Sequence, residues 1–396
     1  MEQILGQKEQ KTMKVVVAID SFKGSLSSLE AGNAAKAGIL NAVPESEVIV
    51  CPLADGGEGT VNALSLGMDG HLETVVVTGP LGAPVDCTYG IIENSKTAII
   101  EMAGAAGITL IPPERRNPLF TTTYGVGEVI KDAILKGCRH FIIGIGGSAT
   151  NDGGIGMLQA LGFELSDQNG QPVPHGANGL KVLAKISDRN VLSELKDCRF
   201  RIACDVKNPL CGTTGASAVY GPQKGATPEM VSSMDGWLAD FATRSAEHFP
   251  HADPLYPGAG AAGGLGFAFL TFLNAQLESG IQIVLEEIGL ENLVKDADYV
   301  VTGEGKLDLQ TSFGKAPVGV AKIAKKFQKP VLAFAGAVTP EATACNECGI
   351  DAFFPILRTV QTLESAMEPE NAAYNMQATA EQAFRLIQAC KSSGSL

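Results

Sequence analysis

Aromatic residues and strongly charged runs are scarce in this chain of 396 residues. Aromatic side chains make up 6% of the sequence, with a single tryptophan, and charged residues make up 18%. No block of lysine and arginine stands out and the formal net charge is −13, so a nucleic-acid partner is not expected. A small anionic ligand remains possible, because glycine turns can create positive potential inside an acidic protein.

Long runs of large apolar residues are missing as well. The stretch 254–277 carries no charge, yet it contains two prolines and several glycines, and its first half is small rather than bulky. This composition favours a buried helix opened by glycine over a membrane span. Residues 1–12 are polar and lack the apolar core of a secretory signal, so we expect a loose extension, no membrane partner and a cytoplasmic protein.

The nine cysteines are odd in number and scattered through apolar runs. This usage indicates reduced, structural thiols. Cys345 and Cys348 form a lone CxxC pair, and a zinc site would need two more ligands nearby. We therefore predict neither a metal centre nor a redox centre at this pair.

Five continuously apolar runs predict buried parallel strands covered by helices on both faces. The second and third runs are about 245 residues apart, far more than one crossover connection requires. We therefore predict an α/β protein with two domains: a discontinuous flavodoxin-like parallel-sheet domain, 1–70 plus 293–396, and an inserted mixed-sheet α/β domain, 71–292. The predicted strands are 13–20, 47–55, 297–305, 329–336 and 351–357.

Charged residues and glycines gather where three of these strands end. In an open parallel sheet the ligand site lies beyond the carboxyl ends of the strands, so we expect a functional edge there, in a cleft between the two domains. The end of the first strand contains Asp20, Ser21, Lys23 and Ser25, that of the second contains Asp55, Gly56, Gly57 and Glu58, and that of the third contains Gly303, Glu304, Lys306 and Asp308.

The predicted insert carries a glycine loop of its own, "GIGGSATNDGGIG", at 144–156. Amides freed by glycine, followed by a helix N-terminus, predict a cradle for an anion. Glycines at 258–264 predict a turn where another segment approaches closely. The candidate ligand contacts of the insert are Gly146, Gly147, Ser148, Thr150, Asn151, Asp205, Lys207, Asn208 and Lys224.

Two GxGxxG/A matches, which begin at Gly144 and Gly258, leave an NAD(P)-dependent oxidoreductase of a small hydroxy acid open as an alternative. The first match lacks an acidic residue at the end of a clear following strand, and the second follows proline rather than a strand. The sequence contains no GxxxxGK[ST] loop and no GxSxG motif. Several anion-binding loops with carboxylates therefore fit phosphoryl transfer best.

Seven collinear segments resemble the bacterial type-1 glycerate kinase family. They are "MKVVVAIDSFKGSLSS", "PLADGGEGT", "GIGGSATNDGGIGMLQALG", "ACDVKNPLCG", "YGPQKGAT", "PGAGAAGGLGF" and "VTGEGKLDLQTSFGKAPVGVA". The resemblance covers Met13 to the C-terminal helix and implies ATP-dependent phosphorylation of D-glycerate. It favours 2-phosphoglycerate over 3-phosphoglycerate as the product, although the residues themselves fit either hydroxyl.

A kinase of glycerate must hold a carboxylate, orient a hydroxyl and neutralise phosphate charge. On this basis we assign hypothetical roles, with ATP and Mg²⁺ as cofactors. A sugar-acid binding protein without catalysis is a second alternative, and the sequence carries no signal for an oligomeric state. Lys23, Ser21 and Ser25 would meet an anion; Asp205 or Asp308 would accept the hydroxyl proton; Asp55, Glu58 and Glu304 would bind Mg²⁺; Gly146 to Asn151 would hold nucleotide phosphate, with Lys306 or Lys224 on the terminal oxygens.

Overall fold

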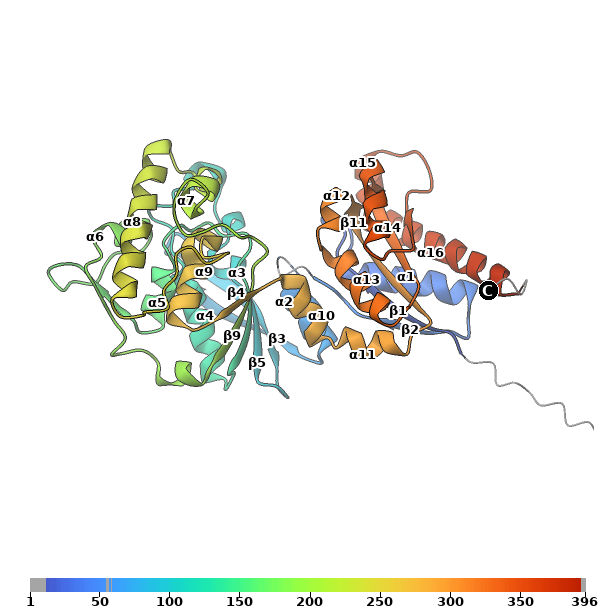
Figure 1. Ribbon diagram of the computed structural model, residues 1–396, viewed down its shortest axis with the longest axis horizontal. Helices are drawn as coiled ribbons and strands as arrows, with labels where there is room; N and C mark the ends of the chain where they lie inside the picture. The colour runs from blue at the N-terminus through green and yellow to red at the C-terminus, as the bar shows by residue number, and fades with distance from the viewer. Residues whose placement is uncertain (1–11, 55–56, 58, 393–396) are drawn as a thin grey trace, which may run out of the picture. The chain divides into compact units, whose positions relative to one another are not determined.

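The computed structural model describes residues 12–54, 57 and 59–392 and divides the chain into two compact units (Figure 1). The first unit contains Met1–Leu53 and Leu285–Leu396, and the second contains Ala54–Val284. Both limits lie earlier in the chain than the predicted domain boundaries at 70 and 292, which remain a prediction. The loose extension predicted at the N-terminus falls almost wholly outside the described residues.

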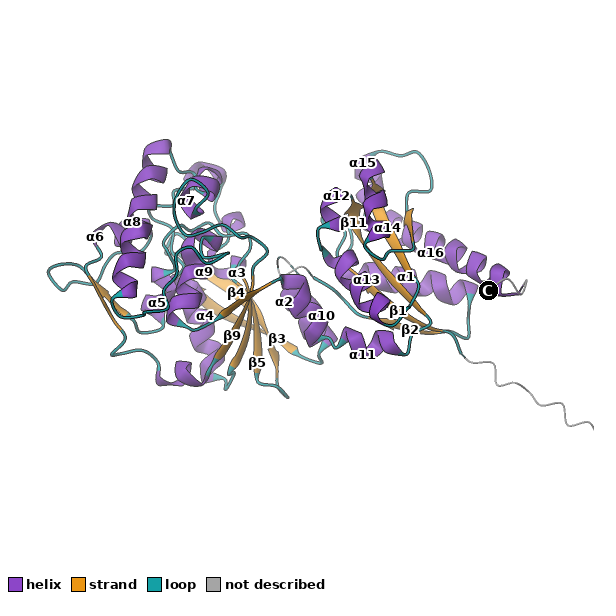
Figure 2. Ribbon diagram, viewed as in Figure 1, coloured by secondary structure: helices purple, strands orange, loops and turns teal. Residues whose placement is uncertain are grey.

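The first unit is built on a five-stranded sheet in which every pair of neighbours is parallel (Figure 2). The strand order is β13-β12-β11-β1-β2, so β1 lies between two strands that are distant from each other in the sequence. This is the flavodoxin-like sheet that the apolar runs predict. The strands are β1 (Lys14–Ile19), β2 (Glu47–Val50), β11 (Tyr299–Leu307), β12 (Val331–Val338) and β13 (Ala352–Pro355).

Helices α1 (Ser28–Ala42) and α16 (Pro369–Ser392) pack closely against each other in this unit. A Cβ added to Gly38 would lie 2.0 Å from the carbonyl oxygen of Gln377, so only glycine permits this approach. The N-terminus of α1 is fixed by a capping box between Ser27 and Glu30. The other helices are α11 (Leu290–Lys295), α12 (Leu309–Ser312), α13 (Ala316–Lys326), η5 (Pro340–Thr343), α14 (Ala344–Glu347) and α15 (Leu363–Met367), while α10 (Gly280–Glu287) spans the limit between the units.

The second unit contains a six-stranded mixed sheet, in the order β10-β9-β6-β5-β4-β3. The three strands that come first in the chain, β3, β4 and β5, form the predicted antiparallel meander. The remaining neighbours in the sheet pair in parallel. A small antiparallel pair, β7 with β8, stands apart from this sheet. The strands are β3 (His71–Thr78), β4 (Pro84–Ile92), β5 (Thr97–Glu101), β6 (His140–Gly144), β7 (Glu164–Ser166), β8 (Lys185–Ser187), β9 (Arg199–Ala203) and β10 (Gln276–Glu278).

Among the helices of this unit, α9 (Ala261–Phe272) is the buried helix that the uncharged stretch predicts. Its phenylalanines pack against Phe241 and Phe200 in the core. No helix in the described part of the chain is long and apolar enough to cross a membrane. The other helices are α2 (Thr60–Gly67), α3 (Ala103–Ala106), η1 (Ile108–Leu110), η2 (Pro113–Arg115), α4 (Tyr124–Leu135), α5 (Ile155–Ala160), α6 (Ala177–Val182), η3 (Ser193–Asp197), α7 (Ala216–Tyr220), η4 (Pro222–Lys224) and α8 (Pro228–Ala246).

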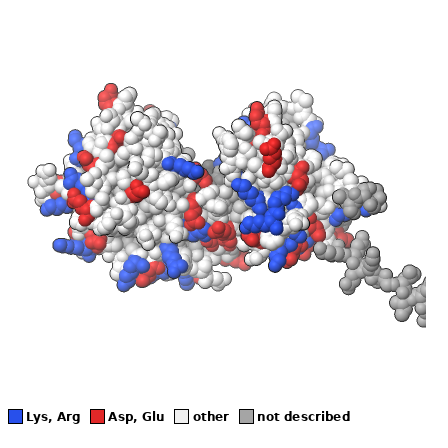
Figure 3. Space-filling model, in the orientation of Figure 1, with Lys and Arg blue, Asp and Glu red and all other residues white. Residues whose placement is uncertain are grey.

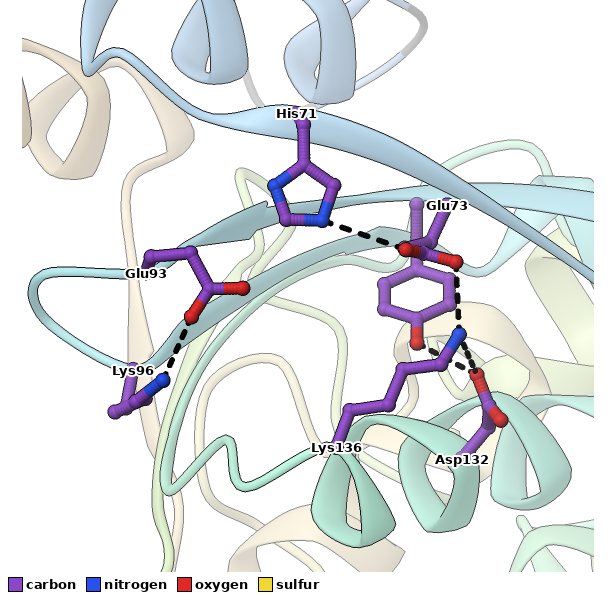
Figure 4. A network of polar contacts seen from close by, with 7 residues as sticks. His71, Glu73, Glu93, Lys96, Asp132 and Lys136 are labelled. Atoms are coloured by element: carbon purple, nitrogen blue, oxygen red, sulfur yellow. Dashed lines mark hydrogen bonds and ion pairs between the residues drawn. The ribbon is translucent and has the colours of Figure 1, made fainter.

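A polar network joins β3 and β4 to α4 in the second unit (Figure 4). The ammonium of Lys136 lies 2.9 Å from Glu73 and 3.0 Å from Asp132. The buried hydroxyl of Tyr89 donates to Asp132 over 2.6 Å, and burial is the main reason why the pKa of this phenol is raised. The network therefore anchors a helix to the edge region of the sheet.

Acidic and basic side chains are interspersed over the face drawn in Figure 3, with one basic group over α13. Two lysines in the last turn of that helix are ion-paired, since Lys325 lies 2.5 Å from Asp351 and Lys326 lies 2.9 Å from Glu291. Lysines are favourable at a helix C-terminus because they offset the partial negative charge there. The ion pairs and the position at the helix C-terminus therefore explain these two lysines structurally.

Candidate active site

The carboxyl ends of β1 and β11 meet at one edge of the parallel sheet, as the sequence predicts. The amide of Asp20 donates to the carbonyl of Gly303 over 2.9 Å, which extends the β1–β11 pairing beyond the strand. Asp20 is buried, and its Oδ1 accepts the amide of Ser21 over 2.7 Å. The first and third predicted strand ends are therefore brought together.

Glu304 is a buried carboxylate at this edge, next to Gly303 in β11. Its Oε1 accepts a hydrogen bond of 2.5 Å from the hydroxyl of Thr311. Burial raises the pKa of Glu304, while the Thr311 hydrogen bond and the charges of Lys315 and Lys23 act in the opposite direction.

Asp308 serves as the N-cap of α12. Its Oδ1 accepts the amide of Gln310 over 2.9 Å, and its own amide donates to the Thr311 hydroxyl over 3.2 Å. Burial alone would raise the pKa of Asp308, but Lys315 and the two capping amides outweigh it, and the pKa is lowered. Lys306 lies 3.5 Å away and is mostly exposed. The local sequence thus explains Asp308 as a cap, whatever else it does.

Three hydroxyls of this unit are buried without a hydrogen-bond partner within the described residues. They belong to Ser25, which the sequence predicts as a contact, and to Thr302 and Thr339, which it does not. Buried polar atoms are normally paired, so each calls for a partner such as water or a ligand. Lys23, by contrast, is exposed.

The second predicted strand end is described only at Gly57. Asp55, Gly56 and Glu58 fall outside the described residues, but Gly57 belongs to the second unit. A Cβ added to Gly146 would lie 4.0 Å from the Cα of Gly57. Of this strand end, Gly57 therefore lies beside the glycine loop of the second unit.

The glycine loop after β6 has an exposed tip and a buried base. Gly146 and Gly147 are exposed, and Gly147 has a φ of 72°, which favours glycine. Among the described residues, no acceptor is found for the amides of these two glycines. Ser148, Thr150 and Asn151 are buried, so their side chains line the base of the loop and not its tip.

The base of this loop contains Lys224, a lysine that is only 2% exposed. Its Nζ donates to the hydroxyl of Ser148 over 2.8 Å and to the carbonyl of Thr150 over 2.6 Å. Burial lowers the pKa of Lys224 to about 7, and the charge of Asp152 opposes that shift. The sequence predicts Lys224 as a phosphate contact; the structure instead places it beneath the loop, with two protein partners.

Asp152, which sequence reasoning did not single out, organises the start of α5. It is fully buried and accepts the amide and hydroxyl of Thr123, each over 2.9 Å, and the amides of Gly154 and Gly156. Burial raises the pKa of Asp152, although these hydrogen bonds lower it. The predicted cradle at the N-terminus of this helix is therefore already filled by a carboxylate from the chain. An aspartate directly before two glycines is the signal that could have indicated such a cap.

The glycines at 258–264 allow a close approach, as predicted. Ala262, Gly263 and Gly264 all have positive φ, and a Cβ on Gly263 would lie 2.1 Å from the carbonyl oxygen of Thr150. The amide of Gly153 donates to the carbonyl of Gly263 over 2.9 Å. The turn at 262–264 therefore packs against the backbone of the glycine loop.

The residues after β9 divide into a structural and an accessible group. The Oδ1 of Asn208 accepts the hydroxyl of Tyr220 over 2.7 Å and its Nδ2 donates to the carbonyl of Thr214, so both ends of the amide are used. Asp205 is exposed and accepts the amide of Gly280 over 3.2 Å, and Lys207 is exposed. The accessible candidates at this strand end are therefore Asp205 and Lys207.

No group of three or more His, Cys, Asp or Glu side chains is arranged around a metal site within the described ranges. Mg²⁺ in kinases commonly takes only one or two carboxylates and phosphate oxygens, so such a cluster is not required. Glu304 fits this donor chemistry, because one of its oxygens accepts from Thr311 and the other has no partner among the described residues. The cysteines are all free thiols, and Cys345 lies beside the carbonyl of Asp308.

Comparison with known proteins agrees with this architecture. The sequence profile described as "Glycerate kinase family" matches residues 15–388. A glycerate kinase from Haemophilus influenzae is 46% identical over 95% of this chain and 99% of its own length. A glycerate kinase from Bacillus subtilis is 46% identical over 96% and 99%, and a glycerate 2-kinase from Escherichia coli is 47% identical over 89% and 93%.

The fold is also similar to a solved structure. A crystal structure from Salmonella typhimurium LT2, provisionally assigned as glycerate kinase 2, is 46% identical and superimposes with a TM-score of 0.89 over 96% of this chain and all of that chain. Neither an oxidoreductase nor a non-catalytic binding protein is supported by these similarities. The chain therefore belongs to the glycerate kinase family and is a kinase of that family.

Proposed function

We propose that this kinase transfers the γ-phosphoryl group of ATP to D-glycerate and that 2-phosphoglycerate is the product. The observation that carries the proposal is the exposed pair Gly146 and Gly147: the amides of these two glycines lack acceptors among the described residues. Gly57 lies beside Gly146. Unpaired amides on a glycine turn suit phosphate oxygens. The name of the Escherichia coli relative supports transfer to the 2-hydroxyl.

We propose Glu304 as a ligand of Mg²⁺; Asp55 and Glu58, which the sequence predicts as further ligands, lie outside the described residues. When bound, the ion would neutralise charge on the transferring phosphoryl group. Glu304 supports this assignment because its carboxylate is held by Thr311 with one oxygen left over. The nearby positive charges of Lys23 and Lys315 favour its ionised form despite burial.

The remaining candidates divide between binding and proton transfer. Lys23, Ser21 and Ser25 would hold an anionic group of the substrate, since Ser25 has a buried hydroxyl in need of a partner. Asp205 or Asp308 would accept the proton of the reacting hydroxyl. Lys306, exposed beside Asp308, and Lys207 would contact phosphate or carboxylate oxygens.

An assay of ADP release with D-glycerate, and with L-glycerate as the control substrate, tests the reaction. Phosphorus NMR of the product identifies the hydroxyl, because a phosphate on the CH group gives a doublet and one on the CH₂ group gives a triplet. We expect ADP release with D-glycerate and a doublet. A triplet would refute the 2-hydroxyl assignment, and thermal stabilisation by NAD(H) but not by ATP with Mg²⁺ would refute the kinase reaction.

A further inference from the structure

Lys224 is an unusual occupant of the protein interior. It ends η4, it is 2% exposed, and the next residue, Gly225, has a φ of 92° and lies against the backbone of Arg116. A side chain on Gly225 would meet the carbonyl oxygen of Arg116 at 2.2 Å. The backbone around Lys224 is thus fixed tightly enough to direct a long cationic side chain inward.

Both partners of the Lys224 ammonium come just after the exposed glycines in the chain. The Nζ of Lys224 contacts Ser148, which directly follows Gly147, and Thr150, two residues further on. Neither partner is a carboxylate, so this is no ordinary buried ion pair. An apolar residue could fill the same space without the desolvation that a buried ammonium suffers.

These contacts give the lysine a specific effect on the loop. A carbonyl oxygen turned toward a bound anion would repel it, and Lys224 holds the carbonyl of Thr150 on the inner side. The Lys224 ammonium lies beneath a turn whose two glycines are exposed, and when charged it favours an anion there through a medium of low dielectric constant.

We infer that Lys224 is a positioning residue that holds the turn from Gly146 to Thr150 in the conformation that binds phosphate, without touching the ligand itself. The inference rests on the proposed function only in naming the ligand as a nucleotide phosphate. The anchoring of Ser148 and Thr150 does not depend on that name.

The variant Lys224→Met removes the donors and the charge but keeps a similar volume, so the chain should still fold. Lys196→Met is the matched control, because Lys196 is exposed and precedes β9, away from the strand end that carries the loop. Isothermal titration with an imido analogue of ATP and Mg²⁺, and separately with D-glycerate, measures the two affinities. We expect Lys224→Met to weaken nucleotide binding by about tenfold or more, as for the loss of one charged hydrogen bond. Glycerate affinity and Lys196→Met should stay within about twofold of wild type.

Amide hydrogen exchange of the peptide 144–152 provides a readout that needs no ligand. We expect faster exchange there in Lys224→Met and no change in Lys196→Met. Ser148→Ala completes a double-mutant cycle, in which the two changes should be non-additive because they remove the same contact. If Lys224→Met folds poorly, Ser148→Ala alone should still speed exchange of this peptide.

Unchanged exchange and unchanged nucleotide affinity in Lys224→Met would overturn the inference, as would equal losses of nucleotide and glycerate affinity. A wild-type chain that binds no nucleotide would refute the proposed function instead. In that case faster amide exchange of the peptide 144–152 in Lys224→Met would still support the anchoring role, and unchanged exchange would refute it.

Discussion

The hydroxyl of Thr311 donates a hydrogen bond of 2.5 Å to the buried carboxylate of Glu304. The bond connects the first turn of α12 to the strand β11, seven residues earlier in the chain. It holds one carboxylate oxygen in place and leaves the other available. A group held in this way is suited to a task that requires a defined charge position.

Glu304→Gln tests this role. Glutamine keeps an acceptor for Thr311 and the same shape but removes the charge, so we expect kcat to fall by about 100-fold or more if the carboxylate acts on phosphate through a cation. Glu45→Gln is the control, because Glu45 is exposed and precedes β2, at the opposite end of the strands. Steady-state kinetics that show near wild-type kcat for Glu304→Gln would remove Glu304 from the site.

The stability of the wild type and that of the Glu304→Gln variant should diverge as the pH changes. Burial raises the pKa of Glu304 above its ordinary value of 4.5. A raised pKa favours the folded state below 4.5, and this advantage disappears as the pH rises through the folded pKa. The Tm of the wild type should therefore fall relative to that of Glu304→Gln as the pH increases above 4.5. A difference that stays constant between pH 4 and pH 8 would contradict this.

Asp205→Asn and Asp308→Asn distinguish the two candidate bases. Asparagine caps a helix as well as aspartate does, so Asp308→Asn should keep its Tm, whereas Asp308→Ala should lose about 1 kcal/mol. The variant at the true base should lose about 10²-fold to 10⁴-fold in kcat. If both asparagine variants retain near wild-type kcat with D-glycerate, neither aspartate is the base.

Gly146→Ala and Gly263→Ala separate binding from stability at the glycine loop. A Cβ at Gly146 has open space, with Gly57 at 4.0 Å, so Tm should stay within about 2 °C of wild type while nucleotide KM rises. At Gly263 a Cβ would collide with the carbonyl oxygen of Thr150, and φ is 69°, so we expect a loss of about 2–4 kcal/mol. Urea unfolding measures the free energy of unfolding of both variants. Equal stability of the two variants would contradict the packing described above.

Tyr89→Phe measures the network drawn in Figure 4. It removes a buried hydroxyl that donates to Asp132, so the free energy of unfolding should fall by about 1–2 kcal/mol. Lys136→Met removes two ion pairs that are more exposed and should cost less than about 1 kcal/mol. Both variants should keep kcat and KM. A larger loss for Lys136→Met than for Tyr89→Phe would show that the ion pairs dominate.

Much of the architecture could be predicted from the sequence because it depends on apolar runs. Each predicted strand of the parallel sheet overlaps an observed strand, and the long separation before the third run explains why β1 pairs with β11. The second run ends sooner than predicted, at Val50, and the second unit begins four residues later, at Ala54. Apolar composition alone does not tell a strand from the extended segment that follows it.

The interior of the glycine loop was harder to predict. Lysine and aspartate are usually exposed, so the sequence predicts Lys224 as an accessible phosphate contact and overlooks Asp152. Their burial depends on partners far away in the chain, namely Ser148 and Thr123. Such pairings become visible only when the tertiary structure is known, because no local pattern marks them.

The proximity of Gly57 to Gly146 means that one unit alone brings these two glycines together. Both residues belong to the second unit, which begins at Ala54 and ends at Val284. A phosphate group bound by both glycines, as proposed above, would therefore depend on the fold of that unit.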